Sequence, residues 1–233
     1  MPIPATTAAL VALLLFLPSP AHPQAPVTPG ADPRINSQFV QPDVPLWAER
    51  FEGESREIYA RRDAIVAASG VTAGMTVADV GAGTGFFAML FARAVGPQGR
   101  VIAADVSRPF IDAIGKRATA EGLRNVTTVL STQVDTGLAA TSVDVVFTSD
   151  TYHHFEQVGP VLASIHRALK PGGRFIVIDY ERIPGITPKR TLDHVRAGKE
   201  TVTAEVVSAG FRLREEIRTL RLSENYFLVF ERP

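Results

Sequence analysis

The residues with the clearest chemical meaning form a glycine-rich turn after a short apolar run. Residues 75–80 (MTVADV) have the length and content of a buried strand that ends beside an acid, Asp79. The turn itself consists of Gly81, Ala82, Gly83, Thr84 and Gly85. Glycine permits positive φ angles and close approach of a ligand to the backbone, and a helix that starts here presents free N–H groups. The pattern therefore predicts a ligand-binding loop flanked by a carboxylate.

The spacing of the glycines separates this loop from a dinucleotide site. Pyrophosphate-binding loops have the spacing G-x-G-x-x-G, whereas the third glycine here comes one residue early, at Gly85, and Phe86 follows it. Asp79 is out of place opposite a pyrophosphate, but it suits the amino-acid end of S-adenosylmethionine, a ligand with an ammonium, a sulfonium and no phosphate. A second acid, Asp105, ends the next predicted strand, where a carboxylate can accept both ribose hydroxyls.

Strands and helices alternate through the rest of the chain. Apolar runs predict strands at residues 75–80, 100–105, 126–130, 143–148, 174–179, 211–220 and 226–231. The alternation with helices predicts an α/β fold: a Rossmann-like, doubly wound, mostly parallel seven-stranded sheet with an antiparallel last strand. In such sheets ligands bind beyond the carboxyl ends of the strands, so the residues that follow each strand are the candidates for the site.

Four sequence segments in this order carry a family resemblance: VADVGAGTGFF, VIAADVS, DVVFTSDTYHHF and RALKPGGRFIVID. With them the chain resembles the class I S-adenosylmethionine-dependent methyltransferases of the small-molecule type, from about residue 70 to residue 232. The resemblance implies S-adenosylmethionine as the cofactor. It places Asp79, Gly81, Ala82, Gly83 and Gly85 around the methionine part of that cofactor.

The same resemblance assigns the nucleoside end of the cofactor. Asp105 would bind the ribose, and Val106 would lie beside the adenine. The family often has an acid after the third strand, where this chain has residues 131–135 (STQVD). Gln133 is the candidate adenine contact there, with the backbone of Val134 as the alternative.

The acceptor side of the expected site follows the fourth strand, at Asp150, His153 and His154. The Asn/Asp-Pro-Pro-aromatic motif of many amino-group methyltransferases is missing, and the paired histidines resemble small-molecule C- and O-methyltransferases, including the quinone-biosynthesis type. A histidine could remove the acceptor proton and Asp150 could orient it. The alternative is that one histidine caps a helix and the other bonds within the core. Because His153 and His154 are adjacent, we do not expect both to face one ion, and no metal site is predicted.

Two flanking segments are candidates to close the site. Residues 47–68 have helical spacing in their second half, and Arg56 and Tyr59, on this helix before the first strand, could act as a lid. Residues 182–199 are basic and carry His194 and Arg196, so this segment either recognises an acidic acceptor or forms a solvated surface loop.

Composition narrows the partners. The chain has 24 Lys and Arg, 24 Asp and Glu, and no cysteine, so thiolate metal sites and disulfides are excluded. Without a basic excess, a small-molecule acceptor is expected and nucleic acid is not.

Residues 1–25 contain an apolar run, 8–17, that is too short to span a bilayer and resembles a signal peptide without its basic start. We expect export or tethering through this leader, and a cytoplasmic location if the leader does not function.

Residues 26–45 are proline-rich and are expected to form a linker, and residues 46–233 the methyltransferase domain with its N-terminal helical lid. Oligomeric state is not predicted. Two other functions stay open: a nicotinamide-dependent Rossmann oxidoreductase, and a non-catalytic module that binds S-adenosylmethionine. The early third glycine and the LKPGG segment oppose the first, and the intact pair Asp79 and Asp105 argues for a working cofactor pocket.

Overall fold

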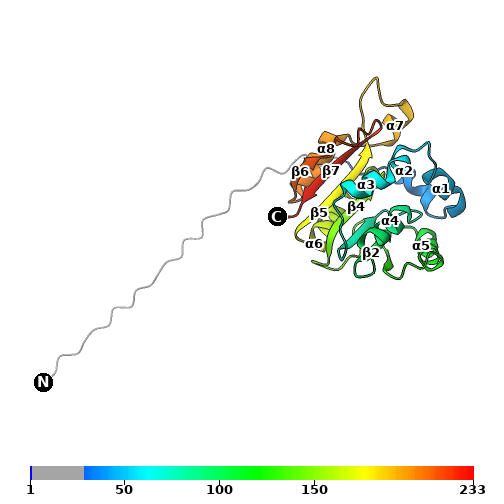
Figure 1. Ribbon diagram of the computed structural model, residues 1–233. Helices are drawn as coiled ribbons and strands as arrows, with labels where there is room; N and C mark the ends of the chain where they lie inside the picture. The colour runs from blue at the N-terminus through cyan, green and yellow to red at the C-terminus, as the bar shows by residue number, and fades with distance from the viewer. Residues whose placement is uncertain (2–28) are drawn as a thin grey trace.

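Seven strands form one sheet in the computed structural model, which describes residue 1 and residues 29–233 (Figure 1). The strand order is β3-β2-β1-β4-β5-β7-β6. The strands are β1 (Thr76–Val80), β2 (Arg100–Asp105), β3 (Val126–Leu130), β4 (Val143–Ser149), β5 (Leu169–Tyr180), β6 (Arg212–Glu216) and β7 (Asn225–Glu231). Strands β1 to β5 run parallel, and β7 is antiparallel to both of its neighbours. The prediction of a Rossmann-like, mostly parallel sheet with an antiparallel last strand is confirmed.

Helices cover both faces of the sheet (Figure 1). The helical elements are η1 (Pro33–Phe39), α1 (Val44–Phe51), α2 (Glu57–Ala60), α3 (Arg62–Ala68), α4 (Phe86–Val95), α5 (Arg108–Ala120), η2 (Tyr152–His154), α6 (Val158–Ala168), α7 (Lys189–His194) and α8 (Lys199–Ser208). Apolar residues of α6 and α8 pack on one face and those of α3, α4 and α5 on the other. Side chains alternate along each strand, so β1 sends Ala78 and Val80 into the first core and Val77 into the second.

The helix predicted in the second half of residues 47–68 is in fact two short helices, α2 and α3, and a further helix, α1, precedes a break in the helical chain. The break falls at residues 52–56, which include Gly53, a poor helix former. Because the chain turns there, Arg56 and Glu57 reach the rim of the sheet. The Glu57 carboxylate accepts hydrogen bonds from the backbone N–H groups of Glu224 at 2.9 Å and Asn225 at 3.1 Å. These bonds fix the N-terminal helices to the connection between β6 and β7.

The proline-rich segment does not behave as a free linker in its described part. Residues 33–39 form η1, which Asp32 caps by accepting from the Arg34 N–H at 2.9 Å. Ala31 donates its N–H to the Phe155 carbonyl at 2.9 Å, and a Cβ on Gly30 would lie 1.9 Å from the Glu156 carbonyl oxygen. The linker prediction is therefore wrong for residues 30–45, because this backbone packs directly against the segment that follows η2.

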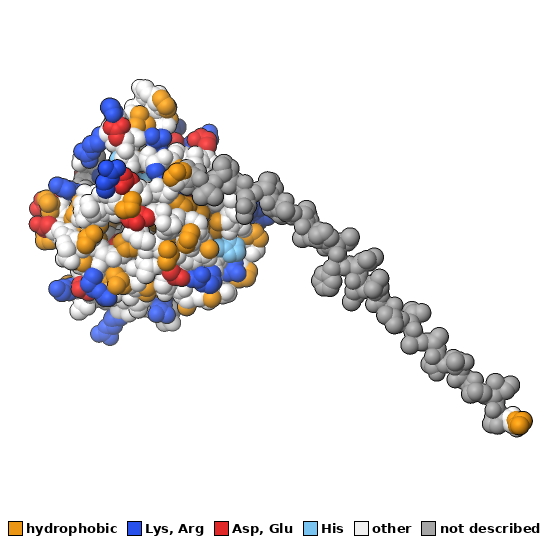
Figure 2. Space-filling view, turned by 180° about the vertical axis from the view of Figure 1, so that it is seen from behind, with side chains coloured by type: hydrophobic (Ala, Val, Ile, Leu, Met, Phe, Trp, Pro, Cys, Tyr) orange, Lys and Arg blue, Asp and Glu red, His pale blue; other side chains and the backbone are white. Residues whose placement is uncertain are grey.

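The predicted leader, apart from Met1, lies outside the described residues. Within residues 29–233, none of the helices has both the length and the hydropathy that crossing a bilayer requires. On the face shown in Figure 2, basic and acidic side chains are interspersed over the surface.

Candidate functional site

A cavity of about 880 Å³ opens at the carboxyl ends of the central strands. This volume is in the range of small-molecule and cofactor pockets. Most of the predicted site residues line it: Asp79, Gly81, Ala82, Gly83, Asp105, Val106, Gln133, Asp150, His153 and His154. The sheet topology explains the convergence, since parallel strands bring the residues that follow them to one edge. Gly85, the last glycine of the predicted cofactor loop, does not line the cavity.

The glycine loop is shaped by close contact with the loop after β4. Gly81 has φ +74°, and a Cβ there would lie 2.1 Å from Cγ2 of Thr151, so no other residue fits without rearrangement. Gly85 has φ +77° at the start of α4, and a Cβ there would lie 2.8 Å from Cγ1 of Ile114. The missing side chain at Gly81 thus lets the loop after β1 approach Thr151, whereas the one at Gly85 allows α4 and α5 to pack.

Asp79 is a buried carboxylate with an unmatched oxygen. The residue is 3% exposed, and its Oδ2 has no hydrogen-bond partner among the described residues. Burial, together with nearby Asp105, raises the pKa of Asp79 to about 7. A buried polar atom that lacks a partner is costly unless a ligand completes it, and this one borders the cavity. Asp79 therefore fits a cationic group such as the ammonium of S-adenosylmethionine.

Asp105 ties the nucleoside side of the cavity to the glycine loop. Its Oδ2 accepts the Gly83 N–H at 2.9 Å, and its Oδ1 accepts the Ser107 N–H at 2.8 Å. Each oxygen keeps a lone pair for a further donor, such as a ribose hydroxyl. Val106 is 46% exposed and lines the cavity beside Asp105. This arrangement suits an apolar contact with a flat base.

Of the two candidate adenine contacts, only Gln133 borders the cavity. The backbone N–H of Val134 instead donates to Thr132 Oγ1 at 3.3 Å. The side-chain amide of Gln133 is therefore the better candidate to contact the base.

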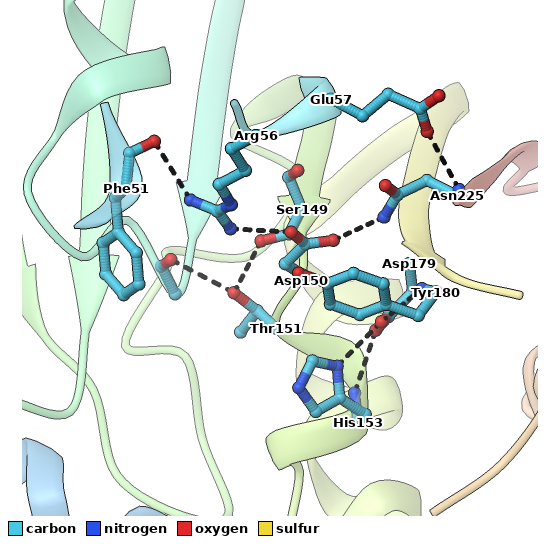
Figure 3. Close-up of polar contacts among 11 residues, drawn as sticks. Phe51, Arg56, Glu57, Ser149, Asp150, Thr151, His153, Asp179, Tyr180 and Asn225 are labelled. Carbon is cyan, nitrogen blue, oxygen red and sulfur yellow. Dashed lines mark hydrogen bonds and ion pairs between the residues drawn. The ribbon is translucent and has the colours of Figure 1, made fainter. Parts of the chain in front are cut away.

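Asp150 sits in a strained turn and holds two side chains from distant elements (Figure 3). Its φ is +47°, in the left-handed region that non-glycine residues rarely occupy. Arg56 Nη2 donates to Oδ2 at 2.6 Å, and Asn225 Nδ2 donates to Oδ1 at 2.6 Å. The Asp150 side chain is 4% exposed, and burial raises the pKa of this carboxyl although Arg56 opposes the shift. The prediction that Asp150 orients a catalytic histidine is wrong, because both of its oxygens bond elsewhere.

The residue that orients His153 is Asp179, at the end of β5 (Figure 3). His153 Nδ1 lies 2.7 Å from Asp179 Oδ1, and the His153 backbone N–H donates to Oδ2 at 3.0 Å. Asp179 is 1% exposed, so the contact is shielded from water. Asp179 was not among the residues predicted from the sequence. A signal was present, since RFIVID ends a predicted strand in an acid, as the strands before Asp79 and Asp105 do.

His154 and His194 complete a cluster with His153. Nδ1 of His154 lies 2.8 Å from Oδ1 of Asn36, which comes from η1. His194 ends α7, and its ring centroid lies 5.1 Å from that of each of the other two rings. The expectation that the adjacent histidines cannot face one point is wrong, because one ring nitrogen from each of the three lies within 4.8 Å of the others. The turn of η2 directs both side chains to the same side.

Only some of the residues predicted to close the site line the cavity. Arg56 lines the cavity, whereas Tyr59 does not line it and packs on Phe86 with ring centroids 4.9 Å apart. Arg196 is held by Glu205 at 2.9 and 2.7 Å and does not line the cavity, so it is not placed to bind an acidic acceptor. Arg190 of α7 lines the cavity instead.

A wall of aromatic side chains, which was not predicted from the sequence, also lines the cavity. Ring centroids of Phe39 and Trp47 lie 4.8 Å apart, and those of Trp47 and Phe51 lie 4.9 Å apart. Phe39 also contacts His154 edge-on, with centroids 5.2 Å apart. All three aromatic residues line the cavity. Elements η1 and α1 therefore give the acceptor side an apolar cover.

Comparison with known proteins agrees with this geometry. Residues 78–177 match a family model described as a methyltransferase domain. The chain is 35% identical over 94 residues to the uncharacterized protein YafE of Escherichia coli, covering 36% of this chain and 45% of YafE. It is 30% identical over 116 residues to the ubiquinone/menaquinone biosynthesis C-methyltransferase UbiE of Hydrogenovibrio crunogenus, covering 49% and 46% of the two chains. The chain thus spans about half the length of these curated relatives.

Among solved structures, a SAM-dependent methyltransferase from Aquifex aeolicus superposes with a TM-score of 0.72 at 22% identity. The superposition covers 83% of this chain and 100% of that one. At this level of identity the likeness shows a shared fold.

Proposed function

Because the chain belongs to the class I S-adenosylmethionine-dependent methyltransferase family, we propose that it methylates an oxygen or carbon atom of a small molecule. When bound, S-adenosylmethionine supplies a methyl group on a cationic sulfonium, which is open to in-line displacement. Asp79 and the loop 81–83 would hold the amino-acid end of the cofactor, and Asp105, Val106 and Gln133 its nucleoside end. The unmatched Oδ2 of Asp79 is the observation that supports this fit.

The His153–Asp179 pair is the single observation that carries the methyl-transfer proposal. His153 lines the same cavity as Asp79, and Asp179 holds it from behind. Phenols and enols are poor nucleophiles until they lose a proton, and a positioned base contributes about 10²–10⁴-fold to such a step. The Asp179 carboxylate accepts from Nδ1–H, so the lone pair of Nε2 is available to take the acceptor proton. Positioning of donor and acceptor in one enclosed cavity supplies much of the remaining rate.

The acceptor is proposed to be flat and apolar with one ionisable hydroxyl. The aromatic wall of Phe39, Trp47 and Phe51 suits stacking against a ring. The resemblance to UbiE, which is named as a quinone-biosynthesis C-methyltransferase, makes phenols and hydroquinones the first acceptors to test.

The test measures S-adenosylhomocysteine formed from S-adenosylmethionine with a panel of phenols and hydroquinones. The wild-type protein is expected to turn over at least one of them. His153→Gln is expected to lose about 10²–10⁴-fold in kcat and to keep calorimetric binding of S-adenosylhomocysteine. Cofactor binding without turnover of any acceptor would favour a non-catalytic binding module, and stabilisation by NAD in place of S-adenosylmethionine would favour an oxidoreductase.

We further propose export, or tethering, through the leader. The apolar run at residues 8–17 and the small residues after it support this. Mass spectrometry of the N-terminus of the protein from its native host tests the proposal. Cleavage near residue 25 would support it, and an intact N-terminus in a cytoplasmic fraction would contradict it.

A further inference from the structure

Three imidazoles from two distant parts of the chain meet at the acceptor side of the cavity. His153 and His154 come from η2, and His194 comes from the end of α7. Their ring centroids are 4.2 to 5.1 Å apart, and one nitrogen from each lies within 4.8 Å of the other two. All three residues line the cavity.

The hydrogen bonds at the rear of two of these rings fix which nitrogen is free. Asp179 accepts from His153 Nδ1 at 2.7 Å. Asn36 Oδ1 accepts from His154 Nδ1 at 2.8 Å. The orientation of the Asn36 amide is set independently, because its Nδ2 donates to the His154 carbonyl at 3.0 Å and to Glu156 Oε1 at 2.7 Å. Both Nε2 atoms therefore keep a lone pair, and a carboxylate and an amide support the two rings as they do in metal sites.

We infer that His153, His154 and His194 bind a divalent transition-metal ion of the zinc class. Imidazole nitrogen is a ligand that Zn²⁺, Fe²⁺, Ni²⁺ and Cu²⁺ accept. Three protein ligands leave a fourth position for water or substrate, which is the arrangement of catalytic zinc sites. In this protein that position would face the cavity. A tetrahedral ion needs ligand nitrogens about 3.3 Å apart, so the rings must close slightly around it.

Charged side chains of both signs lie near the cluster. The Asp179 carboxylate behind His153 supplies a compensating negative charge. Arg50, Arg56 and Arg190 also line the cavity, and Arg56 is paired with Asp150.

The role of the ion in catalysis rests on the proposed methyl transfer. An acceptor hydroxyl in the fourth position would lose its proton to solvent more readily, because a bound cation lowers the pKa of an oxygen ligand. Ionisation of the acceptor would then depend on the three histidines together and not on His153 alone.

The experiment titrates the chelator-treated full chain with Zn²⁺ by calorimetry and with Co²⁺ by visible absorption. One equivalent of each is expected to bind, and Co²⁺ is expected to give the intense bands of a four-coordinate site. His194→Ala should lower Zn²⁺ affinity at least about 100-fold, and Asp179→Asn about 10–100-fold. His166→Ala is the matched control, because His166 packs on Phe211 away from the cluster and should bind as the wild type does.

Binding of S-adenosylhomocysteine to each variant shows that the domain is folded. The inference is overturned if the folded wild type binds no Zn²⁺, or if His194→Ala binds it equally well. The metal site and the methyl transfer can be contradicted separately. Metal binding without methyl transfer would support the metal site and contradict the proposed function. Methyl transfer by a protein that binds no metal would support the proposed function and contradict the metal site.

Discussion

The two halves of the cavity are built from different material. The cofactor half consists of the loop after β1, which offers mainly backbone groups, and of Asp79, Asp105, Val106 and Gln133 near the ends of β1, β2 and β3. The acceptor half combines side chains from η1, α1, η2 and α7 with Asp150, and it depends on contacts such as those of Asn36 with His154 and of Asn225 with Asp150. Neighbouring strand ends hold the cofactor half, as in the contacts of Gly83 with Asp105 and of Gly81 with Thr151, whereas the acceptor half also requires that the N- and C-terminal parts of the chain have docked.

This difference predicts that substitutions in one half leave the other half working. The largest difference between the effect on methyl transfer and the effect on cofactor binding is expected for Asp179→Asn. This change replaces the carboxylate that accepts the hydrogen bond from His153 Nδ1, and it favours the wrong tautomer of the imidazole. The kcat for methyl transfer should fall by about 10²–10⁴-fold. The Kd for S-adenosylhomocysteine should change by less than about twofold, since Asp179 does not line the cavity. A parallel loss of cofactor binding would mean that Asp179 acts on the fold and not on His153.

The reciprocal change is Asp79→Asn in the cofactor half. It removes the buried charge that would pair with the cofactor's cationic end, and such a charged hydrogen bond is worth about 1.5–3 kcal/mol. Calorimetry should show S-adenosylmethionine affinity lower by about 10–150-fold. If the affinity is unchanged, Asp79 does not contact the cofactor. Zn²⁺ affinity at the histidine cluster should stay at the wild-type value.

The pH dependence of cofactor binding tests whether the ionised Asp79 carboxylate contacts the cofactor. The pKa of Asp79 is raised to about 7 in the folded protein, so this carboxyl holds a proton below that pH. A cationic ligand favours the ionised form, and affinity should therefore rise as pH increases through 7. Between pH 6 and pH 8 we expect about a tenfold gain in S-adenosylmethionine affinity. Asp79→Asn should flatten the profile, and a wild-type profile that is already flat would contradict the assignment.

The same raised pKa has a consequence for stability. Below the folded pKa the native state holds a proton that the unfolded chain releases above about pH 4. The contribution of Asp79 to the free energy of unfolding therefore falls as pH rises from about 4 to 7.

The smallest effect is expected at the outer edge of the acceptor half. Asn36→Ala removes the amide that holds His154, and the acceptor KM should rise about three- to tenfold with an unchanged S-adenosylhomocysteine Kd. Ser37→Ala on the same turn is the control, because the Ser37 hydroxyl donates to the Arg34 carbonyl and does not contact His154. Equal effects from both changes would mean that η1 acts through its fold and not through His154.

The cofactor half of the cavity was largely predicted from the sequence, whereas the acceptor half was predicted only in part. Strand–helix alternation was sufficient for the sheet, and the strand-end acids Asp79 and Asp105 were found because parallel strands bring their carboxyl ends to one edge. Asp179 ends its strand in the same way and was within reach of that argument. The assignment of Asp150 to a histidine was wrong, because its left-handed backbone and its partners Arg56 and Asn225 cannot be read from local sequence.

The sequence by itself determined the strands and helices of the sheet, the glycine loop and the family to which they point. The signal for each strand, helix and loop comes from residues within a few positions of one another. Tertiary structure alone decided that His194 and Asn36 join the paired histidines, and that a segment resembling a linker covers the cavity. Contacts between residues more than a hundred positions apart, as between Asn36 and His154, leave no periodic signal in the chain. They arise because the packing of distant elements on a common sheet edge sets which side chains meet.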